Sequence, residues 1–81
     1  MLITASQCRS ARALIEMTQP ELATAAGLGL STVVDFEKSR RTVSADAVAA
    51  LRVALEASGV IFIAENGEGP GVRLRKTAGD R

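Results

Sequence analysis

The stretch that most constrains the fold is QPELATAAGLGLSTVVDFE, residues 19–37, because two short helical patterns lie in it with only a tight turn between them. Thr18 and Glu21 have capping-box spacing, so the first of these helices is expected to begin there. Gly27 stands where a left-handed residue reverses the chain. Two helices that cross steeply at small residues, here Ala23 and Gly27, are typical of a helix-turn-helix.

Apolar spacing assigns an inner and an outer face to these two helices. Leu22, Ala25 and Ala26 share one face of the first helix at helical spacing. The inner positions of the second helix are Val33, Phe36 and Glu37. Its outward or bordering positions are Leu30, Ser31, Val34 and Asp35.

Two further helices are expected to support this pair. The first begins at a capping box formed by Thr4 and Gln7 and carries a helical stripe of Cys8, Ala11, Leu14 and Ile15. The other begins after Ser44, a good N-cap residue, and ends before Gly59. Its core stripe consists of Val48, Leu51 and Leu55, widened by Ala47 and Ala54.

Beyond Gly59 the pattern changes from helical to strand-like. VIFIAE (60–65) and GVRLRK (71–76) flank a loop rich in Gly, Asn and Pro, which predicts a β-hairpin. Val60, Phe62 and Ala64 would share one face, with Ile61, Ile63 and Glu65 on the other. In the second strand Val72 and Leu74 would point inward and Arg73 and Arg75 outward. The GEGPG segment lies between strands, so it is interpreted as a hairpin loop and not as a phosphate cradle.

The chain resembles the Cro/C1 (XRE-type) helix-turn-helix family over roughly residues 8–58. The resemblance is carried by Gln19, Leu22-Ala23, Ala26-Gly27-Leu28, Thr32-Val33 and Glu37. It implies a mainly α fold, a four-helix helix-turn-helix domain of the lambda-repressor-like type, here with a C-terminal β-hairpin. The expected boundaries are 4–58 for the DNA-binding domain, 59–76 for the hairpin and 77–81 for a disordered tail. Gly29 departs from the family, which usually has Ser or Thr as this N-cap.

In that family the second helix of the pair lies in the DNA major groove. The resemblance places Leu30, Ser31, Thr32 and Asp35 near the bases, where Leu30 would contact a thymine methyl group and Asp35 would accept from a cytosine amino group. Gln19 would bond a phosphate. The family also implies an ion pair between Arg12 and Glu37; the alternative is two separately solvated charges.

The connector KSRRTVS gathers Lys38, Arg40 and Arg41 beyond the end of the same helix. These side chains are expected to contact phosphates, which supply affinity and register without reading sequence. A solvated loop, whose charge offsets the helix dipole, is the simpler alternative.

The hairpin is expected to form a homodimer. An isolated two-stranded hairpin is marginally stable and has unpaired edges. A second hairpin related by two-fold symmetry would pair an edge and bury apolar side chains, in a sheet of about four strands. The residues expected at this contact are Ile61, Ile63, Val72 and Leu74. Alternatively the hairpin caps its own domain and the protein is a monomer or dimerises elsewhere.

Composition limits the functions that the chain can have. The 81 residues suffice for one domain, and a net charge of +1 requires any DNA-binding charge to be local. Cys8 is the only cysteine and histidine is absent, so we expect no disulfide within the chain, no metal, no cofactor and no enzyme activity. Cys8 is interpreted as a small buried residue, with a redox switch as the alternative. Neither a signal peptide nor a membrane span is evident, which favours the cytoplasm.

The sequence therefore favours a sequence-specific DNA-binding transcriptional regulator that acts as a homodimer on an inverted-repeat operator of double-stranded DNA. The first alternative is the antitoxin of a toxin-antitoxin pair, whose tail engages a toxin. The second is a protein-interaction module that has lost DNA binding. Leu30 and Asp35 keep this second alternative open, because they put a hydrocarbon and a negative charge where base contacts are expected.

Overall fold

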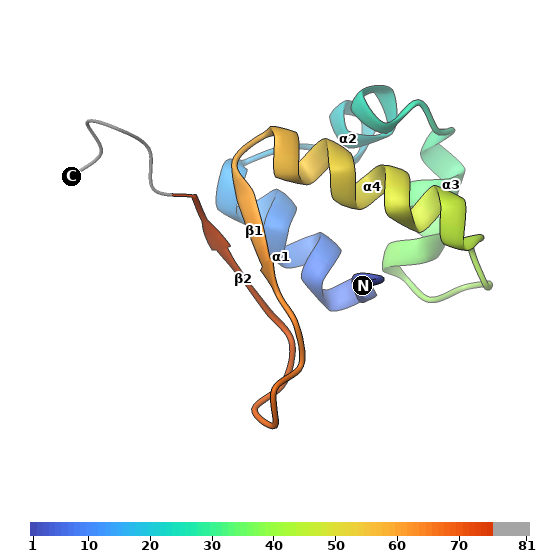
Figure 1. The fold of residues 1–81 in the computed structure, drawn as a ribbon. Helices are drawn as coiled ribbons and strands as arrows, with labels where there is room; N and C mark the ends of the chain where they lie inside the picture. Colours follow the sequence, from blue (N-terminus) through green and yellow to red (C-terminus); the bar gives the residue numbers. More distant parts are fainter. Residues whose placement is uncertain (76–81) are drawn as a thin grey trace.

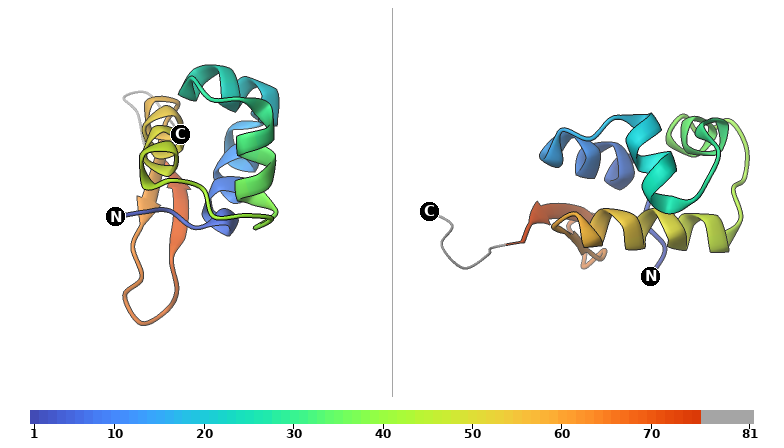
Figure 2. Two further views of the ribbon diagram at one scale, coloured as in Figure 1. Left: turned by 90° about the vertical axis from the view of Figure 1, so that its right-hand side faces the viewer. Right: turned by 90° about the horizontal axis from the view of Figure 1, so that it is seen from above.

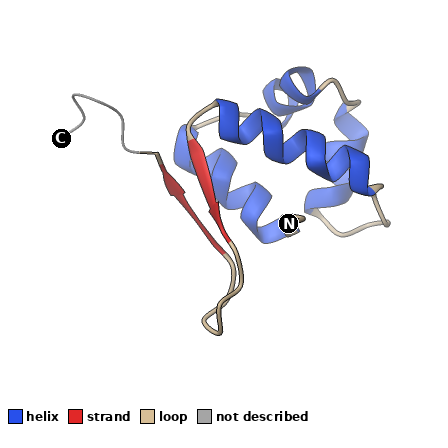
Figure 3. Ribbon diagram, viewed as in Figure 1, coloured by secondary structure: helices blue, strands red, loops and turns tan. Residues whose placement is uncertain are grey.

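The structure is a computed structural model and describes residues 1–75. This part of the chain folds into four helices followed by a two-stranded antiparallel hairpin, as expected (Figures 1 and 3). The elements are α1 (Ala5–Ile15), α2 (Gln19–Ala26), α3 (Leu30–Glu37), α4 (Ala45–Ala57), β1 (Val60–Ile63) and β2 (Gly71–Leu74). Lys76 and the tail expected at 77–81 lie outside the described residues.

The elements pack in two layers. Figure 2 shows α4 and the hairpin in one layer and α1, α2 and α3 in the other. Leucine, valine, alanine and isoleucine side chains fill most of the space between the layers, as the small aromatic content requires. The largest fully buried apolar side chains are Leu22, Val33, Leu51, Leu55 and Val60. In residues 1–75, no helix has the length and apolarity needed to cross a membrane.

Helices begin where the local sequence supplies hydrogen-bonding caps. Both capping boxes form: in α2, the Thr18 hydroxyl accepts from the Glu21 amide at 3.2 Å, and the Glu21 carboxylate accepts from the Thr18 amide at 2.8 Å. The Ser44 hydroxyl caps α4 by accepting from the Ala47 amide at 3.2 Å. Gly29 begins α3 without a side-chain cap.

Three helices end in a turn that requires a left-handed residue. Gly27 fills this position after α2 with φ of 71°, as expected. Glu16 after α1 and Ser39 after α3 do the same with φ of 53° and 54°, although neither is glycine. After α3, the Ser39 amide donates to the Phe36 carbonyl and the Arg40 amide donates to the Asp35 carbonyl at 2.9 Å. This Schellman turn sends the connector back along α3.

Two expected core positions are wrong. Ala25 is exposed, whereas its neighbour Ala23 is buried beside Leu22. The reason is that α2 packs against both α3 and α4, so that its inner face includes Ala23. Leu14, on the last turn of α1, is 40% exposed.

The hairpin is fastened to α1 by a glutamine. Gln7, only 3% exposed, donates its side-chain amide to the carbonyls of Ile63 and Gly71 at 3.2 and 2.9 Å. Beyond Ile63, the Glu65 carboxylate accepts from the amides of Gly67 and Gly69. The strand pattern expected over residues 60–65 therefore stops at Ile63, where the loop takes over the hydrogen bonding.

The register divides the four residues expected at the dimer contact between two faces. Ile61 pairs with Arg73 and Ile63 with Gly71 on one face, while Val60 pairs with Leu74 and Phe62 with Val72 on the other. Val72 packs against the core of its own chain. The two faces are those expected from the alternating pattern of the strands, and the dimer contact stays a prediction. Ile63 and Leu74 remain exposed, at 36% and 52%.

We predict that Ser39→Gly stabilises the protein by about 1 kcal/mol, because glycine adopts a left-handed conformation without the steric cost that a side chain carries. Urea unfolding of the two proteins measures the change. Ser58→Gly is the matched control, since Ser58 ends α4 with φ of −90° and gains nothing from glycine. A lower unfolding free energy for Ser39→Gly would contradict the role assigned to this turn.

Candidate nucleic-acid interface

The outer face of α3 is open to solvent. Leu30 is 46% exposed and Ser31 is also exposed, whereas Val33 and Glu37 are buried against the rest of the protein. Figure 1 shows α3 at the edge of the molecule, away from the hairpin. Of the residues expected near DNA bases, Leu30 and Ser31 are thus accessible, whereas Thr32 and Asp35 are half-buried. The helix itself contains no lysine or arginine.

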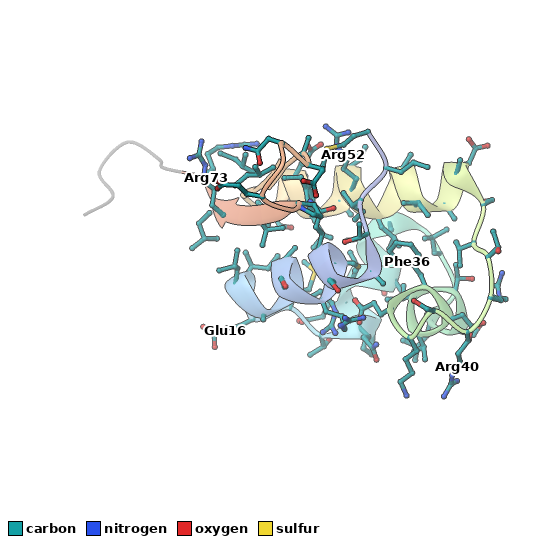
Figure 4. The ribbon with its side chains drawn as sticks, turned by 90° about the horizontal axis from the view of Figure 1, so that it is seen from below. Glu16, Phe36, Arg40, Arg52 and Arg73 are labelled. Carbon is teal, nitrogen blue, oxygen red and sulfur yellow. The ribbon has the colours of Figure 1, made fainter. Side chains whose placement is uncertain are left out.

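The connector brings the missing positive charge to α3. Lys38, Arg40 and Arg41 are all exposed. The Arg41 Nε donates to the Asp35 carboxylate at 2.8 Å, and an Arg40 terminal nitrogen lies 4.0 Å from the other carboxylate oxygen. The structure thus gathers residues that the sequence assigned to bases and to phosphates into one cluster. Figure 4 shows Arg40 on the side of the molecule opposite Arg52.

Asp35 has a different set of partners from the one expected. It was expected to face a cytosine, but its carboxylate binds Arg41 and lies close to Arg40. Arg41 also approaches the Thr32 hydroxyl, at 3.5 Å. No signal in the sequence indicates this pairing, because the left-handed turn at Ser39, which returns the connector to α3, is not marked by a glycine.

Gln19 was expected to bond a phosphate. In the structure it is half-buried at the start of α2, and its side-chain amide donates to the Glu37 carboxylate at 3.0 Å. Its position links the first turn of α2 to the end of α3. The side chain therefore has a partner within the protein.

Glu37 is the centre of a buried polar cluster. Its side chain is 1% exposed, and Arg12 binds both carboxylate oxygens through Nε and Nη2, each at 2.7 Å. Gln19 and the Cys8 thiol also donate to the carboxylate, the thiol at 3.2 Å. Arg9 donates to the Glu37 backbone carbonyl. The ion pair that the family resemblance implied is present, and it joins α1 to the end of α3.

These contacts determine the ionisation of the cluster. Burial by itself raises the pKa of Glu37, but hydrogen bonds from Arg12, Gln19 and Cys8, together with the Arg12 charge, lower it below its usual value. Burial, the hydrogen bond to Glu37 and the negative charge of Glu37 raise the pKa of Cys8 well above the usual range of a thiol. Cys8 thus remains a protonated donor in the core.

Neither the glycine-rich hairpin loop nor a cluster of metal-ligating side chains forms a second site in residues 1–75. In the GEGPG loop, the amides of Gly67 and Gly69 bind the carboxylate of Glu65, so the loop supplies its own anion. Across residues 1–75, no group of three or more His, Cys, Asp or Glu side chains is placed to hold a metal ion.

Comparison with models of known protein families and with curated proteins found no match for this chain.

We predict that the two halves of the buried ion pair differ in importance. Arg12→Gln leaves the fully buried Glu37 without its counter-ion and should cost about 3–5 kcal/mol of unfolding free energy. Glu37→Gln should cost less, because the Arg12 side chain is 20% exposed and can reach water. Urea unfolding at neutral pH measures both. Arg52→Gln, which removes a partly exposed pair with Glu56, is the control and should cost under about 1 kcal/mol.

The same variants should differ in acid. The folded pKa of Glu37 lies below its ordinary value of 4.5, so its contribution is fully present above that pH and is lost as the pH falls through the folded pKa. Glu37→Gln should therefore lose less stability than wild type on acidification. Equal acid sensitivity, or a larger loss for Glu37→Gln than for Arg12→Gln at neutral pH, would contradict this account.

Proposed function

We propose that the protein is a sequence-specific DNA-binding transcriptional regulator. The observation that carries this proposal is the exposed outer face of α3, which lies beside the basic connector while its inner face is held by Glu37 and Val33. A helix of this kind fits the DNA major groove, which is about 12 Å wide. Lys38, Arg40 and Arg41 follow the C-terminal end of this helix, where a phosphate backbone would run.

Each exposed residue has a role that its chemistry allows. Leu30 contacts a thymine methyl group, and Ser31 donates to or accepts from a base edge. Lys38 and Arg40 contact phosphates and provide most of the salt-dependent affinity. A local cluster of this kind lets a chain with a net charge of only +1 bind a polyanion.

A second candidate function is a protein-interaction module that no longer binds DNA. It is favoured by the absence of lysine and arginine from α3 and by Leu30, which is 46% exposed on the same face. The antitoxin alternative differs mainly in the partner of the C-terminal segment, and it keeps the same use of α3. Binding to DNA separates the interaction module from the other two.

We also propose that the regulator acts as a homodimer through its hairpin. In an antiparallel pair, every second residue of an edge strand directs its backbone groups away from its partner, so an edge can accept another strand. Exposed Ile63 and Leu74 lie beside the edges. Because Figure 1 shows α3 and the hairpin on opposite sides of the chain, the two α3 helices would lie at the ends of such a dimer. The operator would be an inverted repeat with half-sites one DNA turn, roughly 34 Å, or a multiple of it apart.

We predict that selection from random DNA enriches one sequence, and that its affinity falls steeply with salt. Lys38→Gln and Arg40→Gln should each reduce the magnitude of the slope of log K against log salt by about 0.9, because each removes one phosphate contact. Arg52→Gln removes the same charge on the opposite side of the molecule and should leave the slope unchanged (Figure 4). No enrichment and no salt-dependent binding would favour the interaction module.

We predict that the full chain is a dimer at micromolar concentration by analytical ultracentrifugation. Ile63→Lys should give a monomer, because it places a charge at the proposed contact while the partly exposed side chain spares the core. Val53→Lys is the control, since Val53 is 64% exposed on α4 and lies outside the contact. A monomeric wild type, or a dimer that survives Ile63→Lys, would overturn the hairpin dimer.

A further inference from the structure

α3 lacks the side chains that most often read base edges. Guanine is read chiefly by arginine or lysine and adenine by asparagine or glutamine, yet none of these residues occurs between Leu30 and Glu37. The helix instead offers short hydroxyl groups, hydrocarbon side chains and Asp35. A long donor must therefore come from another segment if this helix is to recognise a base strongly.

The connector supplies such a donor through the turn at Ser39. The bond from the Arg40 amide to the Asp35 carbonyl folds the chain back on the helix, so that Arg41 reaches α3 from outside. The Arg41 Nε donates to Asp35 at 2.8 Å, and its Nη2 lies 3.5 Å from the Thr32 hydroxyl. Thr32 and Asp35 are one helical turn apart, so the guanidinium lies along the outer side of α3.

The way in which Asp35 binds Arg41 leaves the arginine able to bind something else. A guanidinium has five N–H donors in one plane, and Asp35 takes the Nε donor. The two terminal amines form a separate edge that can donate to two parallel acceptors. The Arg41 side chain is 51% exposed, so this edge is accessible. In DNA such paired acceptors are the O6 and N7 atoms of guanine or the oxygens of a phosphate.

We infer that Asp35 is a positioning residue, which holds Arg41 against α3 so that Arg41 acts as the long donor that this helix lacks. The inference rests on the proposed DNA-binding function. Asp35 itself contacts no base. The Asp35 side chain is 22% exposed, and its negative charge is offset by Arg41 and by Arg40, whose terminal nitrogen lies 4.0 Å from the carboxylate. These two arginines reduce the repulsion between Asp35 and phosphates.

A simpler role for Asp35 makes a different prediction. If Asp35 acted only as a negative charge near DNA, removing it would strengthen binding to any duplex by the same factor whether or not Arg41 was present. If it acts through Arg41, its removal releases the guanidinium, and the effect depends on Arg41. The two roles are therefore separated by comparing the effect of one substitution in two backgrounds.

The experiment uses the full chain with Asp35→Asn, Arg41→Lys and both together. Lysine keeps the charge of Arg41 but cannot hold Asp35 with one nitrogen while presenting a paired edge with two others. The dissociation constant is measured on the selected duplex and on a random duplex at one salt concentration. Asp35→Asn should raise the dissociation constant of the wild-type protein by a factor about fivefold or more larger than the factor by which it raises that of Arg41→Lys. Glu56→Gln is the matched control, because it removes the carboxylate of a similar pair with Arg52 on α4.

The two duplexes identify the acceptor. A coupled loss on the selected duplex alone assigns Arg41 to a guanine, and an equal loss on both duplexes assigns it to a phosphate. If Asp35→Asn changes the dissociation constant by the same factor, within about twofold, in wild type and in Arg41→Lys on both duplexes, the inference is overturned. The proposed DNA binding is unaffected by that result. If the wild type binds neither duplex, the proposed function falls and this inference falls with it.

Discussion

The buried carboxylate of Glu37 is the interaction on which the arrangement of the first three helices depends. A charge removed from water must be compensated by donors, and three side chains donate to the Glu37 carboxylate. Arg12 and Cys8 come from α1, and Gln19 comes from the start of α2. The end of α3 is thereby fixed relative to both other helices. A helix held at its inner end in this way presents its outer face in one orientation, which recognition of a groove requires.

The two acidic residues of α3 show how position decides chemistry. Glu37 and Asp35 are two residues apart, so they point to different sides of the helix. The inward residue meets Arg12 in the core, and the outward residue meets Arg41 at the surface. A salt-sensitive surface pair stabilises little by itself. The Asp35–Arg41 pair matters because it places the Arg41 guanidinium beside α3. We therefore propose that Asp35 positions Arg41, whereas Glu37 stabilises the fold.

The hairpin is part of the domain as well as a candidate dimer element. Val60 is fully buried, Phe62 and Val72 pack on the core, and Gln7 binds both strands near the loop. The large hydrophobic side chains that stay exposed on the hairpin are consequently those of Ile63 and Leu74. A dimer formed here depends on backbone pairing at an edge more than on buried area. Backbone hydrogen bonds between two edge strands are directional. In such a dimer they would set the two-fold relation between the two α3 helices.

The sequence by itself determined the helices, their capped beginnings, the turn at Gly27 and the hairpin, because each depends on residues within a few positions of one another. It also indicated the Arg12 and Glu37 pair, through the family resemblance. Only the tertiary structure decided the partners of long polar side chains. Gln7 meets carbonyls more than fifty positions away, Gln19 turns to Glu37, and Arg41 returns to Asp35. Spacing cannot give such contacts, because a flexible side chain chooses its partner only after folding has fixed which groups lie within reach.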